Sequence, residues 1–377
     1  MLDKRGSYTP PAWRSVLPHA ALTLFPVILG LYIPHFVRYG SEGTGLMHLD
    51  MAYYLAAGRE VFERGNGLTY PNLLDTDPNA PVIYFHWLIW FFGFGIKVLR
   101  LNPVFVFLGI GLASGLILFI ITRLIVAEIW PQSRFQVLLF YLVMWGGGLI
   151  CVAQASVNIL KGRDPFLLLF RLDPASGWWF LNWGRNLAFP TETTYHAVVA
   201  VAWLATLRKH WSLAALMTAL ATATHPWTGL ELLATMSAWW GLRLILVPGR
   251  ESLRYAAVTA LTVTCFLTYY FVYLNSFPSH TRLSEVWALD WSLRARTLAV
   301  AYGPVFVLAA ARLWRDRKNL SEKEGFLVVC FLAAAALALH DRVLPPVQPL
   351  HFTRGYIWTP LFLIGLPLMG DGLSWLR

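Results

Sequence analysis

Charged residues are scarce in this chain of 377 residues. Asp, Glu, Lys and Arg together make up 13% of it, whereas 57% is hydrophobic and the mean hydropathy is +0.54. A soluble domain carries about a quarter charged residues, because its surface must face water. This scarcity excludes a soluble protein and places most of the chain in lipid.

Cysteine is also rare, and so is the pattern of a β-barrel. The three cysteines, Cys151, Cys265 and Cys330, form no CxxC or other paired spacing, which excludes a disulfide framework and a cysteine-based metal or redox motif. Stretches of about 10 residues with alternating hydrophobicity, typical of barrel strands, are lacking. Since segments in lipid must satisfy their own backbone hydrogen bonds, the apolar runs are predicted to be helices.

Apolar runs of about 20 residues, long enough to cross a bilayer, are what the chain has instead. We expect an all-α integral membrane protein with about ten transmembrane helices, between nine and eleven, in a single polytopic domain over residues 1–377. The ten runs fall roughly at 15–36, 103–122, 135–154, 194–208, 211–228, 229–247, 255–275, 297–314, 325–340 and 356–371.

Positive charge predicts how these helices are oriented. The segment 82–99 is apolar enough to be an eleventh span. If it lies along the membrane interface instead, the loops on the amino-terminal side hold 16 Lys plus Arg and 7 Asp plus Glu, and the opposite loops hold 14 and 13. Cytoplasmic loops collect Lys and Arg. We therefore predict an interfacial helix at 82–99, a plasma-membrane protein with both termini cytoplasmic, and no nucleic-acid partner for the net charge of +10.

All the long loops then lie on the extracytoplasmic side. They are 37–102, 155–193, 276–296 and 341–355. Long loops in compact proteins are usually functional, and these are rich in Trp, Tyr and Pro. The active site is therefore expected outside the cytoplasm.

The first of these loops contains a candidate catalytic base. Asp50 stands at the start of a segment with apolar residues on one face and charges on the other, which predicts an amphipathic helix on the membrane surface. An Asp at that position can be only an N-cap. It can also take a proton from an acceptor hydroxyl at the mouth of a helical bundle. His48 and Tyr54 flank Asp50 and are candidate substrate ligands.

One span followed by a long external loop with Asp50, Tyr53 and Tyr54, and then by the segment Pro81–Trp87, resembles the GT-C superfamily of membrane glycosyltransferases. The resemblance covers the topology of residues 1–200, and 201–377 would add further helices. It implies that Asp50 is the general base and that the sugar arrives on a polyprenyl phosphate carrier. Many members have a second acid where this chain has Met51, and His-Pro-Pro where His86 precedes Trp87.

The second external loop offers candidate ligands for a phosphate. Asp164 resembles a second Asp that family members carry after the third span, and Arg163 beside it can hold a phosphate bidentately. Arg185 is a further candidate substrate ligand, or the partner of Glu192 in a structural ion pair.

Later segments add candidate residues at the same membrane side. His225 joins two spans, and Glu231, just inside the next span, is either functional or paired with a neighbouring His or Arg. In the last loop, Arg354 and His351 resemble the residues that family members place against the carrier phosphate, with Gln348 beside them. The sequence establishes no cofactor, and a divalent-metal site built from His48, His225 and His351 is a further hypothesis.

These residues favour transfer of a sugar from a polyprenyl-phosphate-linked donor to an extracytoplasmic lipid or glycan acceptor. Asp50 would deprotonate the acceptor, while Arg163, Arg354 and His351 would hold the leaving phosphate. The alternatives are a membrane acyltransferase with a His base, a lipid or small-molecule transporter with a mid-membrane site, and a non-enzymatic scaffold. The glycosyltransferase hypothesis requires Asp50, Arg163 and Arg354 to converge on one cavity.

Overall fold

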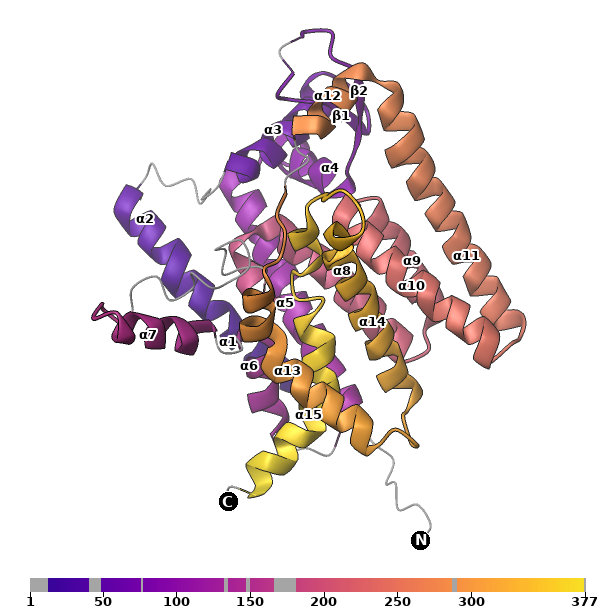
Figure 1. Ribbon diagram of the computed structural model, residues 1–377. Helices are drawn as coiled ribbons and strands as arrows, with labels where there is room; N and C mark the ends of the chain where they lie inside the picture. The colour runs from indigo at the N-terminus through magenta and orange to yellow at the C-terminus, as the bar shows by residue number, and fades with distance from the viewer. Residues whose placement is uncertain are drawn as a thin grey trace.

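The computed structural model describes residues 13–40, 49–75, 77–131, 135–146, 150–165, 181–286 and 290–375. Most of them are helical (Figure 1). In chain order the elements are α1 (Trp13–Val27), η1 (Ile28–Tyr32), α2 (Ile33–Tyr39), α3 (Leu49–Glu63), β1 (Thr69–Pro71), β2 (Val82–Phe85), α4 (Trp87–Gly93), η3 (Phe94–Val98), α5 (Pro103–Ile129), α6 (Gln136–Trp145), α7 (Ile150–Leu160), η6 (Arg185–Ala188), α8 (Pro190–Leu207), α9 (Trp211–Thr222), α10 (Pro226–Leu246), α11 (Arg250–Leu267), η7 (Thr268–Tyr273), η8 (Leu274–Ser276), α12 (Pro278–Val286), α13 (Ala295–Arg315), α14 (Glu322–Ala338), η9 (His340–Arg342), η10 (Pro349–Phe352) and α15 (Trp358–Trp375).

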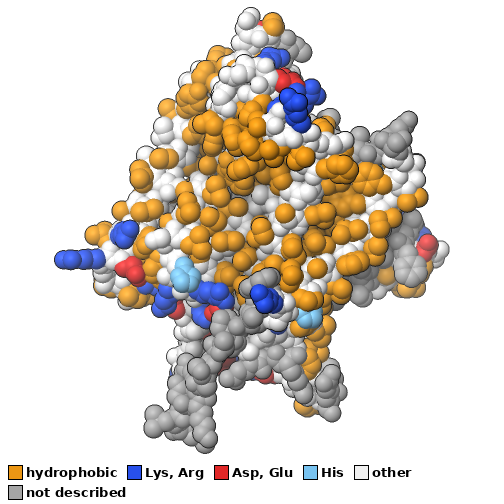
Figure 2. Space-filling model, turned by 180° about the vertical axis from the view of Figure 1, so that it is seen from behind, with side chains coloured by type: hydrophobic (Ala, Val, Ile, Leu, Met, Phe, Trp, Pro, Cys, Tyr) orange, Lys and Arg blue, Asp and Glu red, His pale blue; other side chains and the backbone are white. Residues whose placement is uncertain are grey.

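Several helices are built to lie in a membrane. Among the described residues, four helical stretches are long and apolar enough to cross one: Arg14–Tyr39, Pro103–Ile129, Arg250–Ser276 and Ala295–Arg315. Seen from behind, apolar side chains cover most of the middle of the molecule, with Lys and Arg near the top and below that area (Figure 2). An apolar surface between two charged ends is the surface of an integral membrane protein.

The ten expected spans are only partly reproduced. The run at 135–154 is divided, because α6 ends at Trp145 and α7 begins at Ile150. Helices α8 and α10 have spanning length, but each carries buried polar residues in its first two turns, so they do not stand out as uniformly apolar. The number of membrane crossings therefore stays a prediction.

The segment 82–99 is not one long helix. Strand β2 occupies its start and pairs antiparallel with β1, a hairpin that the all-α prediction did not contain. The helix that follows, Trp87–Val98, has 12 residues and is about 18 Å long, well short of the roughly 30 Å hydrocarbon layer. This length supports the prediction that the segment does not cross.

Helices α3 and α4 pack closely and form a cap with β1 and β2 at one end of the bundle (Figure 1). The helices approach at Gly58 and Gly93, where an added Cβ on either glycine would lie within 2.8 Å of the other helix's backbone. The predicted amphipathic helix at Asp50 is α3. Its apolar residues Met51 and Leu55 are buried against other helices of the protein rather than left for lipid.

The opposite end of the bundle, here called the basic end, joins the ends of α5, α8, α10 and α14 through ion pairs. Glu128 of α5 contacts both Arg208 at 2.7 Å and Lys323 at 2.9 Å. Arg243 of α10 pairs with Glu322, and its guanidinium lies over three tryptophan rings. The basic connections predicted to share one membrane side therefore do lie together.

Candidate functional site

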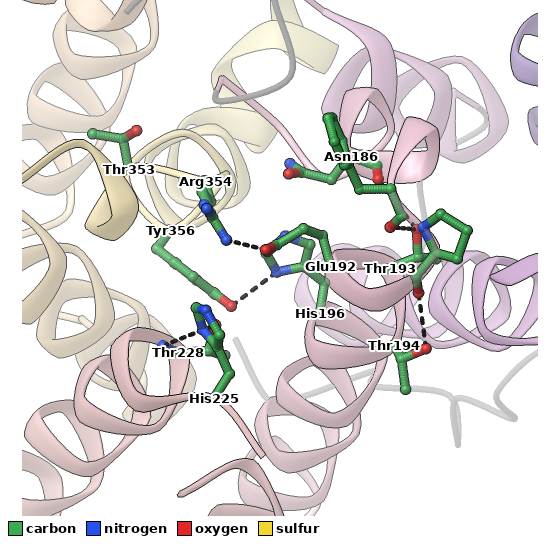
Figure 3. A network of polar contacts seen from close by, with 12 residues as sticks. Asn186, Glu192, Thr193, Thr194, His196, His225, Thr228, Thr353, Arg354 and Tyr356 are labelled. Atoms are coloured by element: carbon green, nitrogen blue, oxygen red, sulfur yellow. Dashed lines mark hydrogen bonds and ion pairs between the residues drawn. The ribbon is translucent and has the colours of Figure 1, made fainter. Parts of the chain in front are cut away.

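A cluster of polar side chains lies under the cap, where α8 and α10 begin and the chain enters α15 (Figure 3). We call it the polar cluster. Its members come from four separate parts of the chain and are His86, Glu192, Tyr195, His196, His225, Thr228, His351, Arg354 and Tyr356.

A buried ion pair and a buried hydrogen bond connect α8 to the last loop. The Arg354 guanidinium contacts the Glu192 carboxylate, and both side chains are about 10% exposed. One turn further along α8, His196 Nδ1 lies 2.8 Å from the Tyr356 hydroxyl. The Nε2 atom of the same ring lies 3.9 Å from Glu192. Because charges leave water at great cost, removing one partner of such a buried pair strongly destabilises a protein.

Two histidines of the cluster cap helices in the same way. His86 precedes α4 and accepts a hydrogen bond at Nδ1 from the Ile89 backbone N–H, and His225 precedes α10 and accepts one from Thr228. In a neutral imidazole with Nδ1 as acceptor, Nε2 carries the proton. His86 therefore donates to the Tyr195 hydroxyl, 2.9 Å away.

Aromatic stacking continues the cluster across the bundle. The Tyr195 ring stacks on His225 with centroids 4.7 Å apart, His225 faces His351 at 6.2 Å, and His351 lies parallel to Trp291 at 5.3 Å. The order from the cap to the last loop is therefore His86, Tyr195, His225, His351.

Burial keeps the loop histidines uncharged. It lowers the pKa of His86 to about 3. Burial, and then the positive charge of Arg354, hold the pKa of His351 well below the usual range. Near neutral pH the rings of His86 and His351 are therefore uncharged, and the Arg354 guanidinium pairs with the Glu192 carboxylate.

Backbone geometry fixes the last loop in place. Gln348 is buried in the left-handed conformation with φ of +48°, and its carbonyl accepts a hydrogen bond from the His351 N–H at 3.0 Å. Gly355 has φ of +84°, and a Cβ there would lie 2.5 Å from the Trp183 ring. Most residues disfavour the left-handed conformation, which here directs His351 and Arg354 into the polar cluster.

Glu231 lies buried in α10, about a turn and a half below His225, with 2% exposure. Neither of its carboxylate oxygens has a hydrogen-bond partner among the described residues. The expected pairing with a neighbouring His or Arg is therefore not found in that part of the chain.

An apolar groove lies on the outside of the bundle near the polar cluster. Helices α4, α5, α8 and α9 form its walls, and its volume is about 640 Å³, within the usual range of ligand sites. We call it the α4–α5 groove. Trp87 and Thr194 are among its lining residues, and their chain neighbours His86 and Tyr195 belong to the polar cluster.

The structure brings some of the predicted site residues together and leaves others apart. His86, His225, His351 and Arg354 meet in the cluster, and the half-buried Tyr54 ring lies 6.0 Å from His86. Gln348 in the last loop and Arg185 in η6 are both buried.

Arg163 and Asp164 do not join the cluster, because they lie exposed just beyond the end of α7. Convergence of Asp50, Arg163 and Arg354 on one cavity stays a prediction. His48 and the Asp50 side chain lie outside the described residues, although Asp50 is in the first turn of α3.

Sequence reasoning missed Tyr195 and Tyr356 as site residues, since a tyrosine near a helix end is ordinary in a membrane protein. The polar run Thr191 to His196 at the start of an apolar helix was the available signal. No group of three or more His, Cys, Asp or Glu in the described part of the chain is arranged to hold a metal ion. The hypothesis of a site from His48, His225 and His351 includes a residue outside that part.

No family model matches the chain, and no curated protein matches it. Among solved structures it is similar to the archaeal oligosaccharyltransferase AglB from Archaeoglobus fulgidus, in complex with an inhibitory peptide and a dolichol-phosphate. The identity is 14% and the TM-score 0.43, with 97% of this chain and 51% of that chain covered. The chain thus spans about half the length of that protein.

Proposed function

We propose that the protein is a membrane glycosyltransferase that moves a sugar from a polyprenyl-phosphate-linked donor to an extracytoplasmic acceptor. The observation that carries this proposal is that consecutive residues line the α4–α5 groove and belong to the polar cluster, Trp87 after His86 and Thr194 before Tyr195. A ligand that fits both parts has a long apolar chain joined to an anionic head. The groove would hold the isoprenoid chain and the cluster the phosphate and the sugar.

Arg354 would stabilise the leaving group. In the reaction, the bond between the sugar C1 and the phosphate oxygen breaks, and the electron pair leaves on the polyprenyl phosphate. A fixed guanidinium near that oxygen stabilises the charge that develops there, which is usually the largest catalytic effect. The contact of Arg354 Nη1 with the Glu192 carboxylate supports this role, because it fixes the guanidinium in the polar cluster.

Asp50 would act as the general base. As the acceptor oxygen bonds to C1, its proton would pass to the Asp50 carboxylate. Next to Asp50, Met51 is buried in the same apolar group as Leu88 and Tyr195, so α3 begins beside the polar cluster. This placement supports the role that the sequence suggested.

The test is transfer of radiolabelled sugar from a panel of polyprenyl-phosphate hexoses and pentoses to a membrane lipid extract, with purified protein in detergent. Gly109 lines the α4–α5 groove and has open space at its Cβ position, so Gly109→Phe fills the groove without striking the core. Gly30, equally open but on the outer face of η1, provides the control Gly30→Phe.

We expect wild type and Gly30→Phe to transfer sugar, Gly109→Phe to lose at least about tenfold, and Asp50→Asn to lose about 10² to 10⁴-fold. Absence of transfer from every donor by wild type would overturn the proposal. Wild-type rates for Gly109→Phe would remove the groove from it, and wild-type rates for Asp50→Asn would place the base elsewhere.

A further inference from the structure

A second groove lies on the other side of α9. Its walls are Phe85 at the end of β2, residues of α9 including Ala219 and Ala223, and residues of α11 and η7 including Cys265 and Tyr269. Its volume is about 350 Å³. We call it the α9–α11 groove. Nothing in the proposed reaction has used it so far.

Three consecutive residues connect the two grooves with the polar cluster. Phe85 lines the α9–α11 groove, His86 belongs to the cluster, and Trp87 lines the α4–α5 groove. Ala223, just after the end of α9, also lines the α9–α11 groove, and His225 of the polar cluster follows two residues later. Each groove is thus lined by residues that stand within two positions of a residue of the polar cluster.

Hydrogen bonds hold this arrangement in position. The Trp87 indole donates to the Leu220 carbonyl at the end of α9, at 3.1 Å. The Phe85 N–H donates to the Tyr269 hydroxyl at 2.8 Å, and that hydroxyl donates to the Ile83 carbonyl at 3.2 Å. The segment Phe85 to Trp87 is therefore fixed both to α9 and to η7.

The walls of the α9–α11 groove suit an apolar occupant. The hydroxyls of Thr222, Thr262 and Tyr270 all donate to backbone carbonyls, at 2.7, 2.9 and 3.4 Å. A polar ligand would find little to bind there, since these donors are already used. One wall is α11, which belongs to a stretch long and apolar enough to span a membrane, so a lipid chain can enter sideways from the bilayer.

We infer that the α9–α11 groove holds the alkyl chain of the acceptor, which makes the acceptor a membrane lipid with a hydroxyl-bearing head group. This inference rests on the proposed function. The donor chain would lie in the α4–α5 groove and the acceptor chain in the α9–α11 groove, with both head groups at the polar cluster. The acceptor hydroxyl oxygen bonds to the sugar C1, its proton goes to the base, and polyprenyl phosphate leaves. The product is a glycolipid.

The first test fills the groove. Cys265→Trp places an indole in the α9–α11 groove, whereas Leu267→Trp adds the same group to an exposed position of α11 outside it. With the lipid extract as acceptor, we expect Cys265→Trp to lower transfer at least about tenfold through a raised KM for lipid, with unchanged binding of a fluorescent polyprenyl phosphate. Leu267→Trp should stay within about twofold of wild type.

A second test needs no enzymatic activity. A phospholipid with a diazirine in its alkyl chain is photo-crosslinked to the full chain in nanodiscs, and the labelled peptides are identified. We expect labelling of residues 219–223 and 261–270 that Cys265→Trp abolishes and Leu267→Trp retains. Labelling unaffected by Cys265→Trp would overturn the inference, as would full transfer by Cys265→Trp.

The two failures are distinguishable. If Gly109→Phe abolishes transfer while Cys265→Trp does not, the proposed function stands and the acceptor site is wrong. If wild type transfers no sugar but labelling depends on Cys265, the groove binds lipid and the glycosyltransferase assignment is wrong, which also overturns the acceptor role.

Discussion

The Lys209–Glu322 pair at the basic end and the Glu192–Arg354 pair in the polar cluster differ in their exposure to solvent. At the basic end the exposure of the ion pairs varies: the Lys209 side chain that pairs with Glu322 is 62% exposed, whereas Glu128, which pairs with Arg208, is 11% exposed. In the polar cluster, the Glu192–Arg354 pair is about 10% exposed and is surrounded by neutral rings. Exposed pairs position helix ends at little cost in free energy, whereas a buried pair costs several kcal/mol of desolvation. Breaking the Glu192–Arg354 pair should therefore cost more free energy than breaking the Lys209–Glu322 pair.

Removing Arg354 should have the largest effect. Arg354→Gln leaves the buried Glu192 carboxylate without its cation, so we expect about 3–5 kcal/mol less stability and loss of sugar transfer. The double variant Glu192→Gln/Arg354→Gln should recover most of the stability and none of the transfer. Thermal unfolding in detergent and the transfer assay measure the two effects. Wild-type stability of Arg354→Gln would contradict the assigned burial.

Acid should destabilise the cluster through His86. Because the pKa of His86 is about 3 in the folded protein and about 6.5 when unfolded, the unfolded chain binds the proton first. Stability is then complete above pH 6.5 and falls as the pH drops toward 3, by about 2–3 kcal/mol at pH 4.5. In His86→Asn, which can still cap α4, this part of the loss should disappear from melting curves taken between pH 7.5 and 4.5. An equal loss of stability with falling pH in wild type and His86→Asn would refute this prediction.

Two tyrosine hydroxyls allow a matched comparison of the ends. Tyr195→Phe leaves the buried His86 N–H without its acceptor, so we expect a loss of about 1–3 kcal/mol together with a clear fall in transfer. Tyr255→Phe removes a hydroxyl that bonds Ser212 at 2.8 Å near the basic end, and it should cost about 1 kcal/mol or less with normal transfer. An equal fall in activity for both would remove the distinction between the ends.

The smallest effect is expected from the exposed pair. Lys209→Ala removes the 2.7 Å contact with Glu322, and it should change stability by less than about 1 kcal/mol and leave transfer unchanged. Raised salt should reduce even this difference, since it screens exposed charges. A loss comparable to that of Arg354→Gln would show that the basic end is as tightly coupled as the cluster.

The sequence predicted the broad class well and the details unevenly. Membrane embedding follows from composition, and the helix at Asp50 and the short helix after His86 follow from pattern and charge. The end of α6 at Trp145 and the start of α7 at Ile150 were missed, because hydrophobicity alone does not show where an apolar helix ends. Arg163 was proposed as a bidentate phosphate ligand, and it lies exposed beyond the end of α7 at Leu160.

The candidate site shows the same division. The sequence alone indicated four of its residues, because each is a polar group at a helix end near one membrane side: His86, His225, His351 and Arg354. The sequence does not show that Glu192 pairs with Arg354 or that Tyr195 lies between His86 and His225, because these residues come from separate helices and loops.

Local sequence thus determined which segments are helical and apolar, since periodicity and capping act over a few residues. Only the tertiary structure decided which polar groups are buried together, because burial and pairing arise from the packing of separate helices. In a bundle, that packing depends on close approaches such as Gly111 of α5 against Pro190 of α8, which no single segment encodes.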